Sequence, residues 1–196
     1  MYQKYIKTCL DFFFAFLLLI VLMPIFIIIV ILLKLTTKSS VFYNQERVGK
    51  NGKFFTVYKF RTMTSDTPII VGKERAKIRN KVTRVGRVLR DTSLDELPQL
   101  FNVLKGNMSL IGPRPVVVAE QNLLELRKVS GAIQLKPGLT GLAQVNGRKN
   151  LSDKQKANFD AEYARQISFF LDASILIRTI PVIFVREGVQ KLLKKH

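Results

Sequence analysis

Cysteine and histidine are almost absent from this sequence. Its 196 residues include one cysteine, Cys9, and one histidine, His196 at the C-terminus. One cysteine cannot form a disulfide within the chain, which is compatible with a reducing compartment. One histidine argues against a zinc site and against a histidine-based catalytic triad, because too few of the usual partners are present.

Acidic residues are also few. The chain has 14 Asp and Glu against 32 Lys and Arg, a formal net charge of +18, and 47% of its residues are hydrophobic. This combination predicts anionic partners and an apolar environment: nucleic acid, an anionic membrane surface or phosphorylated substrates. The length allows one domain, or one domain and an anchor.

One uncharged apolar run, Phe12 to Leu33, is long enough to cross a bilayer as a helix. Pro24 near its centre predicts a kink, because proline removes a backbone hydrogen bond and clashes with the preceding turn. Basic residues flank both ends of the run, so the positive-inside rule gives no clear reason to send either end across the membrane. A spanning helix and a re-entrant helix-break-helix both remain open on these physical grounds.

The residues after this run predict a mixed but mainly helical fold. Val41–Gln45 and Lys53–Phe60 flank an Asn-Gly pair, which is typical of a β-hairpin. Val116–Val129 is predicted to be helical, and a polar helix is predicted from Ser152 to about Arg165. The apolar stretch from Phe169 to Val185 is interrupted by charges and a proline, which favours buried or interfacial helices over a second membrane span.

Two adjacent acids, Asp95 and Glu96, stand where a helix should begin. Ser93 and Glu96 fit a capping box, which would place Pro98 one turn inside the helix; alternatively Leu97 is the cap and Pro98 the first helical residue. A helix N-terminus keeps carboxylates ionised and attracts phosphate, so Asp95 could act as a nucleophile or a metal ligand. From these residues alone, simple compensation of the helix dipole is favoured.

Several basic residues are candidates for binding phosphate. Pro113 and Pro115 restrict the backbone around Arg114, which is a suitable way to fix a phosphate-binding guanidinium. Lys59 and Arg61 alternate with aromatic residues, a pattern found in nucleic-acid-binding surfaces and more often in amphipathic strands. The basic stretch from 73 to 90 could be a solvated helix face or a face that lies on anionic lipid headgroups.

Taken together, the motifs resemble those of a known family. They are, in order, Asp11 before the apolar run, Pro24 within it, Tyr58-Lys59-Phe60-Arg61-Thr62-Met63, Ser93-Leu94-Asp95-Glu96-Leu97-Pro98-Gln99, Gly112-Pro113-Arg114-Pro115, Pro137-Gly138-Leu139-Thr140-Gly141 and Gln144-Val145-Asn146-Gly147-Arg148. Their order and content resemble the bacterial sugar transferases, the monotopic phosphoglycosyl transferases, over essentially the whole chain. The length resembles the minimal catalytic form of that family.

The resemblance implies an activity. Members of the family move a sugar-1-phosphate from a UDP-sugar to a polyprenol phosphate such as undecaprenyl phosphate and release UMP. The aspartate of the Asp-Glu pair forms a covalent phosphosugar intermediate, and Mg²⁺ is held at the pair. We therefore expect Asp95 to be the nucleophile, Glu96 to be its partner and both to hold the metal. Substrate contacts are expected from Arg114 and, more weakly, from Lys59, Arg61, Arg148, Pro113 and Pro115.

The resemblance also implies a location and an architecture. Residues 1–38 would form a re-entrant helix-break-helix anchor, and residues 39–196 a catalytic domain with interfacial C-terminal helices on the cytoplasmic face of the bacterial inner membrane. The fold class is then α+β and mainly helical, the partner surface is anionic lipid, and no nucleic acid is expected. Two alternatives from other classes are a membrane-tethered nucleic-acid-binding protein and a membrane-surface adaptor without catalysis.

Overall fold

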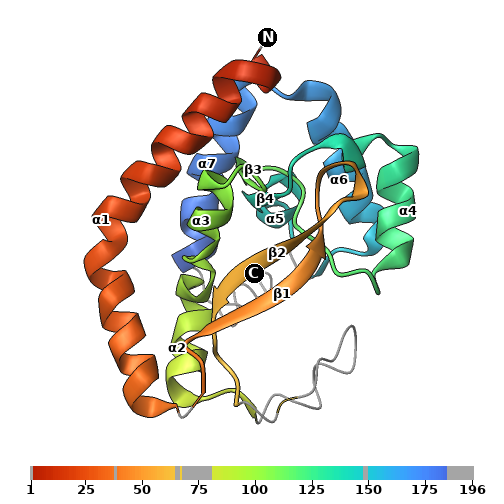
Figure 1. The fold of residues 1–196 in the computed structure, drawn as a ribbon. Helices are drawn as coiled ribbons and strands as arrows, with labels where there is room; N and C mark the ends of the chain where they lie inside the picture. Colours follow the sequence, from red (N-terminus) through yellow and green to blue (C-terminus); the bar gives the residue numbers. More distant parts are fainter. Residues whose placement is uncertain (1, 38, 65–66, 68–80, 148–149, 185–196) are drawn as a thin grey trace, which may run out of the picture.

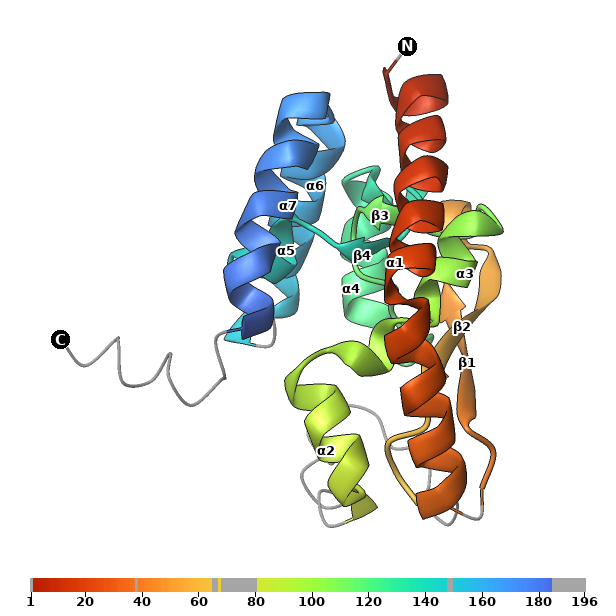
Figure 2. The same cartoon turned by 90° about the vertical axis from the view of Figure 1, so that its left-hand side faces the viewer.

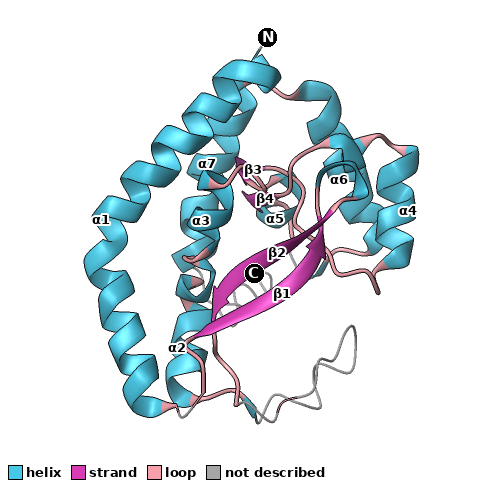
Figure 3. Ribbon diagram, viewed as in Figure 1, coloured by secondary structure: helices cyan, strands magenta, loops and turns pink. Residues whose placement is uncertain are grey.

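The computed structural model describes residues 2–37, 39–64, 67, 81–147 and 150–184. Helices predominate, and one two-stranded antiparallel hairpin is the most prominent sheet (Figure 3), which confirms the mainly helical α+β class. The elements begin with a short π-helix η1 (Tyr2–Ile6) and the long helix α1 (Lys7–Thr36), and continue with β1 (Phe42–Val48), η2 (Lys50–Gly52), β2 (Phe54–Phe60), α2 (Arg84–Asp91), η4 (Leu94–Glu96), α3 (Gln99–Leu104), β3 (Ser109–Ile111), α4 (Gln121–Val129), η5 (Ala132–Gln134), β4 (Gly138–Thr140), α5 (Leu142–Val145), α6 (Asp153–Gln166) and α7 (Phe169–Phe184).

Helix α1 is a single helix of 30 residues that passes through Pro24. The helix-break-helix expected from the sequence is thus one bowed helix, which curves along one side of the molecule (Figure 1). The physical reason is that proline removes only its own N–H from the helix, and a smooth curve can relieve the clash of its ring. By length and apolar composition α1 could cross a membrane, and no other helix among the described residues qualifies.

Both ends of α1 are attached to the rest of the protein. Near its start, Asp11 accepts hydrogen bonds from the Ser109 hydroxyl at 2.7 Å and the Leu110 amide at 3.1 Å, both on β3. Near its end, Leu33 is fully buried in a cluster with Phe60 of β2 and Leu89 of α2. The remaining faces of α1 carry exposed apolar side chains, and only 22% of its most apolar 18-residue stretch is buried.

The predicted hairpin is confirmed. Strands β1 and β2 pair antiparallel, with Phe42 opposite Phe60 and Val48 opposite Phe54. In the turn, Asn51 has a φ of 56°, in the left-handed region that asparagine and glycine tolerate best. The register sets Val57 and Lys59 at alternate positions of β2, so that both side chains reach the same face.

A second, very short sheet lies at the centre of the protein. Strands β3 and β4 are parallel, with Ser109 beside Gly138 and Ile111 beside Thr140. The two chains approach so closely that a side chain at Gly138 would overlap the backbone of Gly112. The core around this sheet is built from buried apolar residues of several elements, including Leu100, Met108, Leu142, Tyr163 and Ile175.

The helices α4, α6 and α7 complete the fold. α4 begins at Gln121, so residues 116–120 of the predicted helix are outside it. The polar helix predicted from Ser152 is confirmed as α6, and the structure adds a full capping box between Ser152 and Gln155. Helices α6 and α7 both pack on α5, and in Figure 2 they lie across the central sheet from α1.

Candidate active site

The two acids lie in a short turn between α2 and α3, not in a capping box. Ser93 has a φ of 58° and its side chain makes no capping bond; the 3-10 turn η4 carries Asp95 and Glu96, and Pro98 occupies the cap of α3. Both sequence-based placements of the helix start are therefore wrong. Leu94–Glu96 forms a separate 3-10 turn, and Pro98, which has no N–H, is the cap residue that precedes α3.

Two close contacts position this turn against the hairpin. Asn102 of α3 donates its side-chain amide to the Thr56 carbonyl at 2.7 Å and accepts from the Tyr58 amide at 3.0 Å, which ties α3 to β2. On the other side, α2 approaches the end of β2 so closely that a side chain at Gly86 would overlap the backbone of Thr62. Lys59, at the end of β2, is thereby brought to the acids.

Glu96 is held by two cations through one oxygen. Its Oε1 accepts from Lys59 Nζ at 2.7 Å and from Arg114 Nη2 at 2.9 Å. Burial alone would raise the pKa of Glu96, but Arg114 and Lys59 outweigh burial and hold that pKa well below its usual range. Burial lowers the pKa of Lys59, and Glu96 opposes that change. Glu96 therefore stays ionised near neutral pH.

Asp95 has the opposite environment. Burial and the neighbouring Glu96 raise its pKa to about 6, against the attraction of Lys59, Arg90 and Arg114. Among the residues that the structure describes, none donates a hydrogen bond to its carboxylate. Asp95 is therefore ionised at neutral pH and partly buried, and three cations are close enough to affect its charge. We call its carboxylate uncommitted because neither of its oxygens accepts a hydrogen bond from the described residues.

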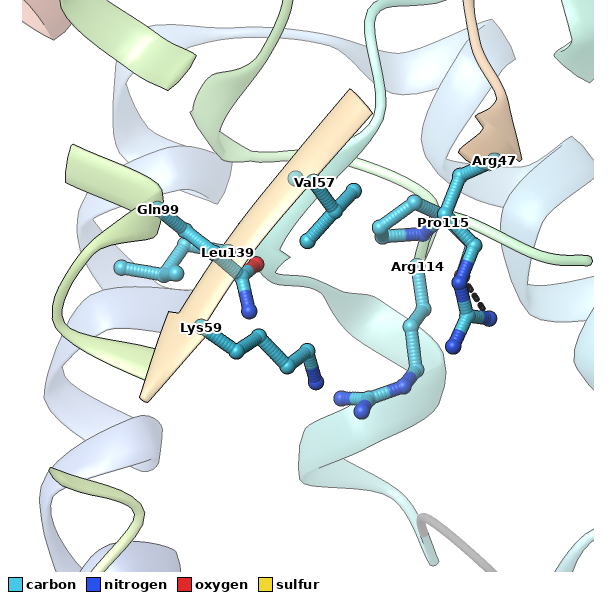
Figure 4. Close-up of a pocket in the computed structure, with 8 residues that line it drawn as sticks. Arg47, Val57, Lys59, Gln99, Arg114, Pro115 and Leu139 are labelled. Carbon is cyan, nitrogen blue, oxygen red and sulfur yellow. Dashed lines mark hydrogen bonds between the residues drawn. The ribbon is translucent and has the colours of Figure 1, made fainter. Parts of the chain in front are cut away.

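The six predicted substrate contacts do not all lie at one place. Lys59 and Arg114 extend toward the same point from opposite sides of a pocket, whose lining also includes Pro115 (Figure 4). Arg61 lies elsewhere: its Nε donates to the Ser40 carbonyl at 2.9 Å and its guanidinium stands 5.9 Å from the centre of the Tyr43 ring. β2 ends at Phe60, so the alternation that aims Lys59 at the acids does not continue to residue 61.

The other two predicted positions have different outcomes. Pro113 does not line this pocket; its carbonyl accepts from the Gly138 amide at 2.8 Å, so it holds the arginine-bearing loop. Arg148 lies outside the residues that the structure describes.

Two further residues, Arg90 and Gln99, belong to the site although the sequence pattern did not single them out. Arg90, in the last turn of α2, lowers the pKa of Asp95 and is oriented by a 2.7 Å hydrogen bond from its Nε to Thr62 Oγ1. Its sequence signal was hidden in a stretch rich in similar cations. Gln99 is 3% exposed and its amide faces the same pocket as Lys59 and Arg114 (Figure 4). The signal in the sequence that could have identified Gln99 is its position three residues after Glu96.

The acids provide a donor set suited to Mg²⁺. Mg²⁺ is usually bound through one or two carboxylates together with substrate phosphates and water. Both oxygens of Asp95 and the Oε2 atom of Glu96 accept no hydrogen bond from the described residues, whereas Glu96 Oε1 is already shared by two cations. The described residues contain no group of three or more possible metal ligands. The set thus fits a metal that is shared with a phosphorylated substrate.

The arrangement can bind and attack a phosphoryl group. Lys59, Arg90 and Arg114 are close enough to Asp95 to affect its charge, and such cations can stabilise the charge of a transferring phosphoryl group. An ionised carboxylate is a competent nucleophile once its repulsion from phosphate is offset.

Comparison with known proteins gives a consistent family. The sequence model described as bacterial sugar transferase matches residues 2–186. The chain is 44% identical over 158 residues to the uncharacterized sugar transferase EpsL of Bacillus subtilis, a match that covers 81% of this chain and 77% of EpsL. It is 38% identical over 164 residues to the UDP-glucose:undecaprenyl-phosphate glucose-1-phosphate transferase of Caulobacter vibrioides, covering 79% of this chain and 61% of that protein.

A longer relative shows the same likeness over part of its length. The undecaprenyl-phosphate galactose phosphotransferase of Salmonella typhimurium is 40% identical over 161 residues, which are 74% of this chain and 34% of that protein. The chain therefore spans about a third of that relative.

Proposed function

Because this chain belongs to the bacterial sugar transferase family and is a transferase enzyme, we propose that it transfers a sugar-1-phosphate from a UDP-sugar to undecaprenyl phosphate. The observation that carries the proposal is the uncommitted carboxylate of Asp95 among Lys59, Arg90 and Arg114. The names of the Caulobacter and Salmonella relatives support the lipid acceptor, and the former supports the UDP-sugar donor. Such a transfer would begin the assembly of a surface glycan.

The proposed reaction has two phosphoryl transfers. Asp95 attacks the β-phosphorus of the UDP-sugar, a bond forms between its Oδ and that phosphorus, and the bond to the bridging oxygen breaks so that UMP leaves with the electron pair. A phosphate oxygen of undecaprenyl phosphate then attacks the same phosphorus. The bond to Asp95 breaks, the carboxylate is regenerated and the product is a lipid-linked diphosphosugar. Mg²⁺ at Asp95 and Glu96 would neutralise diphosphate charge.

Glu96 is assigned a different task from Asp95. Its anion holds Lys59 and Arg114 at one point, 2.7 and 2.9 Å from a single oxygen. A carboxylate with so low a pKa cannot serve as a proton carrier near neutral pH. Glu96 therefore keeps the two cations oriented toward the phosphates, which is electrostatic preorganisation.

The membrane arrangement belongs to the same proposal. α1 carries many exposed apolar side chains, among them Phe13, Val21 and Ile28, which associates the protein with a membrane. Both ends of α1 contact the catalytic body, by which we mean the described residues from 39 onward. This supports a re-entrant helix, with both ends on one side of the membrane, over a spanning helix whose ends lie on opposite sides. We place the catalytic body on the cytoplasmic face of the inner membrane, where a UDP-sugar is available and where basic residues would meet anionic lipid.

The first test is substitution of the nucleophile. In detergent or liposomes with undecaprenyl phosphate and Mg²⁺, the wild-type protein should release UMP from UDP-glucose, UDP-galactose or another UDP-sugar of a panel. Asp95→Asn should lower kcat at least about 10³-fold, because an amide cannot form the acyl phosphate. Mass spectrometry of the wild type mixed with donor alone should show a phosphosugar adduct on Asp95.

A matched control comes from an exposed acid on a different element. Glu125→Gln of α4 removes a surface carboxylate whose one ion-pair partner in the described part of the chain is Lys128, and should leave turnover within about twofold. Full activity of Asp95→Asn would contradict the proposed nucleophile. Salt-sensitive nucleic-acid binding without turnover would instead favour the nucleic-acid-binding alternative.

A further inference from the structure

The loop that carries Arg114 has few backbone donors. Pro113 and Pro115 lack N–H groups, so the loop has to be held chiefly through its carbonyls. The Pro113 carbonyl accepts from the Gly138 amide at 2.8 Å, and the Pro115 carbonyl accepts from Arg47 Nη1 at 3.2 Å. The carbonyl of Arg114 itself accepts from Nη1 of Arg127 at 2.9 Å. A buried arginine thus holds the peptide of the arginine that contacts Glu96.

Arg127 is in turn fixed by a buried acid. Its Nε and Nη2 atoms both lie on Asp160 Oδ2, at 2.8 and 2.6 Å. Arg127 belongs to α4 and is 5% exposed; Asp160 belongs to α6 and is 1% exposed. Two edges of the guanidinium are used at once, one for Asp160 and one for the carbonyl. A lysine has a single nitrogen and cannot hold both in this planar geometry.

Packing alone does not explain this pair. Replacing a buried ion pair by apolar residues of similar volume is often neutral or stabilising, so the pair is not needed merely to join α4 to α6. An apolar pair could not donate to the Arg114 carbonyl. The feature that only the charged pair provides is the fixed peptide beneath Arg114, whose side chain is 44% exposed and is otherwise restrained by Glu96.

We propose that Arg127, held by Asp160, is a positioning residue that fixes the Arg114 peptide and so keeps the Arg114 guanidinium at Glu96 and the substrate phosphates. Arg127 touches neither acid of the site; it acts through Arg114. Its kinetic consequence rests on the proposed transferase function. Its structural consequence, a loop at residues 112–116 that depends on Arg127, does not.

The kinetic test is a double-mutant cycle. Arg127→Lys keeps a cation for Asp160 but gives up one of the two contacts, and should lower kcat/KM about 10- to 100-fold, since small misplacement of a binding group has large effects. In an Arg114→Ala background, Arg127→Lys should change kcat/KM by less than about threefold, because the group that it positions is gone. Lys128→Ala, the next residue on α4, is the matched control and should be near wild type.

A second readout separates this proposal from the transferase proposal. Hydrogen exchange measured by mass spectrometry should be faster at residues 112–117 in Arg127→Lys, with α6 unchanged, whether or not UMP is released. Asp160→Asn, which keeps the side-chain shape, serves in the same way if Arg127→Lys does not fold. Losses that multiply in the double mutant, or unchanged exchange in the loop, would overturn the positioning role; absence of UMP release by the wild type would overturn only the proposed reaction.

Discussion

At the scale of single residues, the site separates two adjacent carboxylates. Asp95 and Glu96 have the same charge and are neighbours in one turn, yet burial and repulsion raise the pKa of Asp95 to about 6 whereas Arg114 and Lys59 hold that of Glu96 far lower. Neighbouring acids with divergent pKa values are typical of sites in which each has its own role. Glu96 organises the cations, and Asp95 remains available to react.

The pH dependence of turnover follows from Asp95. In the proposed reaction Asp95 acts as the carboxylate, and its pKa before Mg²⁺ binds is about 6. At sub-saturating Mg²⁺, kcat/KM should therefore rise about tenfold per pH unit below pH 6 and level off above it. UMP release measured between pH 4.5 and 8.5 checks this. A profile that stays flat down to pH 5 would contradict the assignment, because Asp95 would then have an ordinary pKa.

The stability of the protein supplies a control with the opposite sign. Folding raises the pKa of the Asp95 carboxyl from about 4 in the unfolded chain to about 6 in the folded protein. The free energy of unfolding therefore falls as pH rises through this range, because the folded protein holds the proton more tightly. Asp95→Asn removes that cost, and at pH 7.5 it should be more stable than wild type by on the order of 1–3 kcal/mol. The difference in thermal unfolding should shrink toward pH 4.

At the scale of elements, α1 has two functions. One stripe of its surface, repeating every four residues as Lys7, Asp11, Ala15 and Leu19, is buried against the catalytic body, whereas the other faces are apolar and exposed. A helix that is apolar all round and covered on only one stripe requires an apolar medium on the others. Its bowed course keeps both ends within reach of the same body (Figure 1).

The topology of α1 can be tested by labelling. In a Cys9→Ser background, single cysteines at the exposed positions Gln3 and Ser40 flank the helix. We expect a membrane-impermeant maleimide to label both positions in inverted vesicles and neither in intact cells, because both ends of α1 contact one body. Labelling of position 3 from outside intact cells, with position 40 still protected, would show a spanning helix instead.

At the scale of the whole molecule, one buried polar cluster joins four elements. Lys7 Nζ lies 2.8 Å from Asp172 of α7, and Asp172 also accepts from the Tyr163 hydroxyl of α6 at 2.7 Å. Asp11 of α1 accepts from Ser109 of β3 at 2.7 Å. The cluster therefore fixes the start of α1 to the central sheet and to the helices α6 and α7, because a satisfied buried polar network holds its members in one geometry.

Removal of the lysine from this cluster should destabilise the whole protein. Lys7→Met leaves two buried carboxylates without their shared cation, and breaking such a pair from one side typically costs about 3–5 kcal/mol. Unfolding of the protein in detergent, followed by circular dichroism, measures the loss. Lys34→Met, at the exposed far end of the same helix, is the control and should change stability by under about 0.5 kcal/mol. Equal behaviour of the two variants would contradict the role of the cluster.

Local patterns were sufficient for several features. The apolar run, the Asn-Gly hairpin and the polar helix that starts at Ser152 each depend on neighbours in sequence, and each was confirmed as an element. The start of α3 was not predicted, since competing short turns between Ser93 and Pro98 differ little in local energy and the packing of α2 and α3 on β2 selects among them.

For this protein the sequence alone determined the acids, the loop arginine and the apolar segment, because these depend on residue type, spacing and motif order. Only the tertiary structure decided which cations meet the acids. In the folded protein Lys59 and Arg114 contact one oxygen of Glu96, and Arg61 lies over Tyr43 instead. Arg90, one of a run of similar cations, is the one placed near enough to Asp95 to lower its pKa. The reason is physical: the direction of a long charged side chain is set by where its own element ends and by what that element packs against, which a linear pattern does not contain.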